Sequence, residues 1–144
     1  MKRIILTIAL VLVGGLFLTG CTKNYVALTY TKFVETFNKK SEYIVKDMTL
    51  QTAAFDKAYV AGIGDIQYIY YEFDTVDNAK DYVKVNYDNR DGYSYKDKGT
   101  YIEVVCTNNM YFRLIQVDKM IIIGTSDNYN DKGEINKILK ELGY

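Results

Sequence analysis

Two carboxylates stand two positions apart in the stretch Tyr70-Tyr71-Glu72-Phe73-Asp74. If this stretch is a strand, Glu72 and Asp74 project from one face, because side chains alternate with a period of two. Such a pair could share a metal ion or divide the acid and base roles of a hydrolysis. The simpler interpretation is that Asp74 caps a following helix and Glu72 is a solvated strand residue. We expect no catalytic residue here, because no further group converges on the pair.

Residues 127–134 form a second group rich in oxygen ligands. Their spacing fails that of a calcium-binding loop, because Tyr129 and Lys132 stand where a ligand and a glycine are needed. A turn followed by a helix, with Asp131 and Glu134 as a capping box, explains the run better. The sequence contains no histidine, which excludes the commonest catalytic triads and the histidine-bearing zinc sites. We therefore expect no metal site and no cofactor.

Cys106 follows Ile102 and Val104 in an alternating pattern that is typical of a strand with one apolar face. A reactive thiol needs a nearby histidine or an electropositive site. We expect Cys106 to be a buried, inert thiol.

Tyrosine is the most unusual component, with 15 residues of this type. Alternation in the strand expected over residues 66–74 places Ile69, Tyr71 and Phe73 on one face, interpreted as the core face. Tyr68 and Tyr70 then lie on the opposite face, where an aromatic ring with a polar tip suits protein or glycan contacts. We take Tyr68 and Tyr70 as candidate binding residues. The alternative is cross-strand packing on a half-exposed sheet.

The chain begins with the layout of a secretory signal peptide. Lys2 and Arg3 precede an apolar run that ends at Phe17, and small residues then lead to Cys21. The apolar run is shorter than the roughly 20 residues that a membrane-spanning helix needs. A signal peptide that is cleaved after export is therefore favoured over a transmembrane helix that remains in the protein.

The motif Leu18-Thr19-Gly20-Cys21 resembles the lipobox of bacterial lipoprotein precursors. The resemblance implies cleavage before Cys21 and a diacylglyceryl group on its sulfur, with acyl chains such as palmitate holding the protein on the membrane. Two or more acyl chains anchor a protein stably, whereas one binds marginally. The expected location is the extracytoplasmic face of the cell membrane.

This interpretation divides the chain into a signal peptide (residues 1–20), a lipidated N-terminus with a short tether (21–28) and one domain (29–144). The whole chain carries 18 basic and 18 acidic residues. A balanced charge gives no case for nucleic-acid binding. We expect a monomer whose partners are the membrane, through the lipid on Cys21, and an envelope protein or glycan.

Hydrophobic periodicity predicts an α+β fold. Apolar residues at helical spacing predict helices over residues 30–37, 75–87 and 131–142, and one or two helical turns within 49–55. Alternating or continuous apolar runs predict strands over 43–48, 58–63, 66–74, 100–107, 110–117 and 119–125. Short polar connections between strands favour an antiparallel sheet. We predict a two-layer sandwich, mainly an antiparallel sheet with three amphipathic helices on one face. The run Ile121-Ile122-Ile123 is apolar on both faces, which predicts a strand that is central or covered on both sides.

The domain as a whole is similar to a group of small, uncharacterised lipoproteins from Firmicutes. The similar stretches are the phenylalanine-rich first helix, residues 43–49, residues 70–80 and the end of the chain at 138–144. The resemblance implies no catalytic residues. The expected function is a membrane-anchored cell-envelope lipoprotein with a non-enzymatic binding or accessory domain. The alternative is an envelope-acting hydrolase that uses carboxylates such as Glu72.

Overall fold

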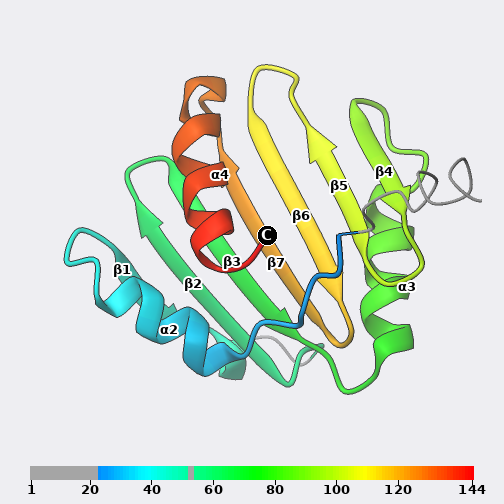
Figure 1. The fold of residues 1–144 in the computed structure, drawn as a ribbon, viewed down its shortest axis with the longest axis horizontal. Coiled ribbons are helices and arrows are strands. Elements are labelled where there is room, and N and C mark those ends of the chain that lie inside the picture. The colour runs from blue at the N-terminus through cyan, green and yellow to red at the C-terminus, as the bar shows by residue number, and fades with distance from the viewer. Residues whose placement is uncertain (1–22, 52–53) are drawn as a thin grey trace, which may run out of the picture.

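The computed structural model describes residues 23–51 and 54–144, which fold around one antiparallel sheet (Figure 1). In these residues, three α-helices and two short 3-10 helices accompany seven strands. The chain order is α2 (Tyr30–Asn38), β1 (Ile44–Asp47), η1 (Thr49–Gln51), β2 (Lys57–Ile63), β3 (Ile66–Glu72), α3 (Val76–Tyr87), β4 (Tyr93–Asp97), β5 (Ile102–Cys106), β6 (Tyr111–Val117), β7 (Met120–Ser126), η2 (Tyr129–Asp131) and α4 (Lys132–Glu141). The predicted signal peptide and Cys21 lie outside the described residues.

The sheet runs in the order β1-β2-β3-β7-β6-β5-β4, and each strand pairs antiparallel with its neighbours. The central pair is β3 with β7, in which Tyr70 lies opposite Ile122. The predicted α+β class and antiparallel sheet are confirmed. The prediction for residues 121–123 is also correct, because β7 occupies the middle of the sheet and these isoleucines are buried on both of its faces.

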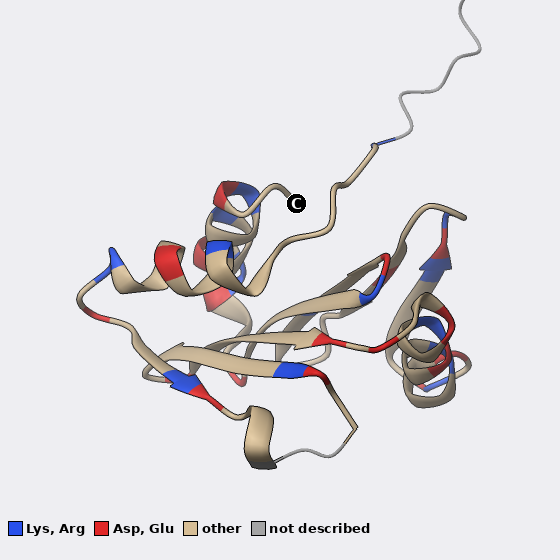
Figure 2. Cartoon of the chain, turned by 90° about the horizontal axis from the view of Figure 1, so that it is seen from below, with Lys and Arg blue, Asp and Glu red and all other residues tan. Residues whose placement is uncertain are grey.

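The prediction that all three helices share one face of the sheet is wrong. Helices α2 and α4 bury Phe33, Phe37 and Ile135 in one cluster, here the first core, which also contains Ile122. Helix α3 buries its apolar side in a second core that contains Ile121 and Ile123. Because successive residues of β7 point to opposite faces, the two cores lie on opposite sides of the sheet. Figure 2 shows α2 and α4 above the sheet, towards the left of the view, and α3 end-on at the right-hand end of the sheet.

Local chemistry explains where two helices begin. The Thr29 hydroxyl accepts a hydrogen bond from Lys32 N at 3.3 Å, and the Thr75 hydroxyl accepts one from Asn78 N at 3.1 Å. Each bond satisfies a backbone donor that the first helical turn leaves free. The capping box predicted for α4 is absent, because the Asp131 carboxylate instead accepts a bond from Ser126 Oγ at 2.6 Å.

Strand β4 was not predicted. It is a short edge strand that, within the described residues, pairs only with β5, and it exposes Ser94, Lys96 and Asp97. The sequence pattern that indicates this strand is the spacing of Tyr93 and Tyr95 two positions apart, which places both half-buried rings against the second core. Polar side chains on an edge strand prevent unwanted pairing, and they also hide the strand from a search for apolar runs.

Gly124 of β7 allows α4 to lie unusually close to the sheet. A Cβ atom at this position would stand 2.5 Å from Ile135 Cγ2 and 3.3 Å from Leu139 Cδ1. Real Cβ atoms do not approach other atoms as closely as the first of these distances. The glycine is thus required by packing between strand and helix.

None of the helices within residues 23–51 and 54–144 has the length and apolar character needed to cross a bilayer.

Candidate functional site

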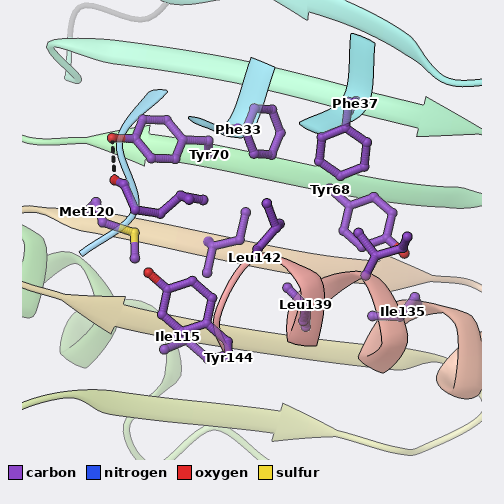
Figure 3. Close-up of a cluster of buried hydrophobic side chains, with 14 of the residues drawn as sticks. Phe33, Phe37, Tyr68, Tyr70, Ile115, Met120, Ile135, Leu139, Leu142 and Tyr144 are labelled. Atoms are coloured by element: carbon purple, nitrogen blue, oxygen red, sulfur yellow. Dashed lines mark hydrogen bonds between the residues drawn. The ribbon is translucent and has the colours of Figure 1, made fainter. Parts of the chain in front are cut away.

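The structure overturns the placement of Tyr68 and Tyr70 on an open face. Their exposed fractions are 0% and 1%, and both belong to the first core. The Tyr68 ring packs on Phe37, with centroids 4.9 Å apart, and the Tyr70 ring lies 5.7 Å from that of Phe33 (Figure 3). Alternation along β3 was predicted correctly, but α2 and α4 cover the tyrosine face. These two rings are packing residues and offer no contact surface.

The polar tips of the two buried tyrosines find acceptors at the margin of the first core. Tyr70 Oη lies 3.1 Å from Leu28 O and 2.9 Å from Glu72 Oε2, so its one proton is shared between these acceptors. Burial, as the main cause, raises the pKa of both Tyr68 and Tyr70 well above the ordinary value of 10. Both hydroxyls therefore stay neutral at any physiological pH.

The N-terminal segment, residues 23–29, is folded against the first core although it forms no helix or strand. The Tyr25 ring meets Tyr101 at 4.7 Å and Tyr144 at 5.2 Å between centroids. Tyr144 Oη donates a hydrogen bond to Val26 O at 2.7 Å. Leu28 is 6% exposed. From Tyr25 onward, the segment is part of the folded body.

A partly buried polar network supports the Tyr25 end of this segment. Arg113 of β6 forms an ion pair with Glu103 of β5, with 2.9 Å between Nε and Oε1. The same guanidinium donates to Asn136 Oδ1 at 3.1 Å and to Tyr25 Oη at 3.4 Å. A planar guanidinium can serve three acceptors at once, and this one joins β5, α4 and the N-terminal segment.

An open hollow of about 350 Å³ lies on the opposite face of the sheet, over β1, β2 and the start of β3. Val45 and Ala61 of these strands face the first core, so their neighbours Ile44, Val60 and Gly62 face the other way. The register places Ile44 beside Gly62, and Gly62 beside Gln67. The lining residues are Glu42, Ile44, Lys46, Val60, Gly62, Ile63, Gly64 and Gln67.

The chemistry of this hollow is an apolar floor with charges at its rim. Ile44 is 67% exposed, which is high for an isoleucine on a strand. Glu42 and Lys46 supply one charge of each sign at the rim. Gly62 leaves part of the floor as bare backbone, a feature that often accompanies close approach of another chain. The hollow is thus an uncovered, partly apolar area at the β1 edge of the sheet.

Glu72 and Asp74, which the sequence did not favour as a catalytic pair, do not form a shared site. Glu72 accepts from Tyr70, whereas Asp74 Oδ1 accepts from Thr75 N at 2.8 Å and from Asn78 Nδ2 at 2.6 Å. Asp74 therefore supports the start of α3, with Thr75 as the capping residue. The structure brings Asp74 to a different carboxylate, Asp56, since both line a polar hollow of about 300 Å³.

Cys106 is buried in the second core with an exposed fraction of 4%, as predicted. Residues 127–131 form a turn with η2 that leads into α4, which confirms the predicted turn and helix start. Across the described ranges, no group of three or more His, Cys, Asp or Glu residues could hold a metal ion.

No family model matches the chain, and neither a curated protein nor a solved structure matches it.

Proposed function

We propose that this protein is a lipid-anchored lipoprotein of the extracytoplasmic membrane face, and that its domain binds a protein partner through the open hollow over β1–β3. The observation that carries this proposal is the uncovered apolar floor around Ile44, on the face of the sheet opposite the N-terminal segment. A chain anchored at residue 21 would thus present its open surface on the side away from the attachment point. The proposed role is non-enzymatic.

A protein segment suits the hollow better than a glycan. Sugar rings are commonly held by flat aromatic side chains, and no aromatic residue is among the described residues that line the hollow. The floor of Ile44, Val60 and Ile63 suits aliphatic side chains of a partner. The opposite charges of Glu42 and Lys46 at the rim suit a partner segment that carries both signs.

The anchor is tested by lipid labelling of the full chain in bacterial cells. Labelled palmitate should enter a membrane-bound, processed species. The Cys21→Ala variant should take up no label and should remain unprocessed or leave the membrane. If that variant is still processed and lipid-labelled, the lipobox interpretation fails.

The binding face is tested by a photo-activated cross-linking residue placed at Ile44 in the membrane-bound protein. Val85 on α3 is the matched control, because it is also aliphatic and is 83% exposed. We expect a defined protein adduct from position 44, lost when Lys46 and Glu42 are exchanged for each other, and none from position 85. Adducts of equal yield from both positions would show that the hollow is not a specific binding face.

A further inference from the structure

We propose that the membrane surface holds this domain in one orientation, with the N-terminal segment and the β4–β5 hairpin toward the lipid headgroups and the open hollow away from them. This inference rests on the lipid anchor proposed above. The domain is thus attached in a fixed pose and does not swing on a flexible linker.

The number of residues between Cys21 and the first one held by the domain carries the argument. Tyr25 is held in the domain by contacts of its ring with Tyr101 and Tyr144. Only residues 22–24 separate it from Cys21. Four residue steps span at most about 14 Å when fully extended. A domain of this size has a radius of gyration of about 14 Å and is more than 30 Å across. The tether is therefore too short for the far side of the domain to reach the bilayer.

The two faces of the sheet determine which surface points outward. The N-terminal segment packs on the first core, and the hollow is lined by residues that alternate to the opposite face. In Figure 2 the chain leaves the domain upward, and η1, next to the grey residues 52–53, lies below the sheet. An anchor on the upper side must place η1 and the hollow on the side away from the bilayer.

The surface around the attachment point suits contact with headgroups. Val26 is 82% exposed, although its neighbours Tyr25 and Leu28 are packed into the domain. The β4–β5 hairpin lies beside it, because Tyr101 of this hairpin region packs on Tyr25 and its carbonyl accepts a bond from Lys98 N at 2.9 Å. Lys98 is exposed, as is Lys23. An apolar side chain flanked by lysines favours the interface between headgroups and acyl chains.

The test measures distance to the lipid surface at two positions of the full-length chain. Lys98→Cys marks the hairpin, and Leu50→Cys marks η1, where the side chain is fully exposed. Each variant is produced with its leader in bacteria, reconstituted into phosphatidylcholine–phosphatidylglycerol vesicles and labelled with a thiol-reactive fluorophore. The parent chain, which keeps Cys106, gives the labelling background. Lipids with a nitroxide on the headgroup quench fluorophores near the surface.

We expect at least threefold stronger quenching at position 98 than at position 50. A matched variant with twenty Gly and Ser residues inserted between Lys23 and Asn24 should lose most of this difference and stay membrane-bound. Equal quenching at both positions in the chain of natural length, with the protein still lipidated, would overturn the fixed orientation and leave the proposed function standing. A chain that is not lipidated at Cys21 would overturn both.

Discussion

Tyr144 Oη donates a hydrogen bond to Val26 O at 2.7 Å and joins two residues 118 positions apart in the sequence. The Tyr144 ring is 7% exposed and also packs on Tyr25. Tyr144, which follows α4, therefore holds the N-terminal segment against the first core. This contact holds Val26 in place and so limits how far the domain can lie from residue 21.

The first prediction concerns this contact. Tyr144→Phe keeps the ring but removes the donor to Val26 O, so the free energy of unfolding should fall by about 1 kcal/mol. Urea denaturation measures the change. Cleavage by trypsin after Lys23 should also become faster, because the adjoining segment is released more often. Tyr30→Phe is the control, since Tyr30 is 39% exposed and should change neither quantity. Equal behaviour of the two variants would contradict the assigned role of Tyr144.

The second prediction follows from the burial of the β3 tyrosines. Tyr68→Ser or Tyr70→Ser should each lower the free energy of unfolding by about 3–5 kcal/mol, as is usual for the loss of a buried aromatic ring. Tyr129 is 41% exposed, so Tyr129→Ser should lower the free energy of unfolding by less than about 1 kcal/mol, as is usual for a surface substitution. Thermal unfolding of the three variants compares them directly. A small effect at position 68 would mean that its ring is not a core residue.

The third prediction compares two glycines. Gly124 of β7 lies against α4, whereas Gly133 lies within α4. Gly124→Ala should destabilise the domain by about 1–3 kcal/mol, because the new methyl group collides with Ile135. Gly133→Ala, within α4 and with nothing within 4 Å of the added Cβ, should be neutral or stabilise by up to about 1 kcal/mol. Denaturant midpoints give both values. Only Gly124→Ala is expected to lower the midpoint, and an unchanged or raised midpoint for that variant would argue against close packing of α4 on β7.

The fourth prediction concerns the thiol of Cys106. With an exposed fraction of 4%, it should react with a thiol reagent at a rate limited by unfolding of the domain. Truncation by Cys106→Ala should cost about 1–2 kcal/mol. Labelling in increasing urea is the measurement. Rapid labelling without denaturant would show that the second core opens locally.

The fifth prediction is a loss of stability at alkaline pH. Burial, as the main cause, raises the pKa of Tyr87 to about 12, and the pKa values of Tyr68, Tyr70 and Tyr144 are also raised. In the unfolded chain tyrosine ionises near pH 10. The native state therefore keeps protons that the unfolded state has released, and stability must fall as pH rises above about 10.

Melting temperatures measured from pH 8 to 12, with absorbance at 295 nm to follow ionisation, test this dependence. Tyr87→Phe should reduce the decline between pH 10 and 12, because it removes one group with a raised pKa. A decline of unchanged steepness would assign the alkaline loss to other groups.

The sequence predicted most elements because their periodicities are strong. Ile135, Ile138 and Leu139 mark one face of α4, and the apolar run of β7 could only be a covered strand. Sequence patterns could not decide which helix covers which face. Both faces of β3 carry large apolar or aromatic residues, so alternation separates Tyr68 from Ile69 without showing which side is more deeply buried. The prediction that Tyr68 and Tyr70 form a binding surface was wrong because a tyrosine ring is as compatible with a core as with a surface.

The hollow was missed for a related reason. Ile44 looks like an ordinary core residue of a short strand, and only the position of α3, over β5–β7, leaves its face uncovered. Likewise, the folded state of Tyr25 depends on Tyr101 and Tyr144, which are far away in sequence. Such long-range contacts leave no local signature.

Strand β7 contributes Ile122 to one core and Ile121 and Ile123 to the other. Both cores contain side chains of this strand, so loss of packing in one core would expose apolar side chains of the other. Unfolding should accordingly be a single cooperative event despite the separated helices. Backbone amides in the middle of the sheet should exchange with solvent only when the whole domain opens, while those of β1 and β4 exchange through fraying of the edges.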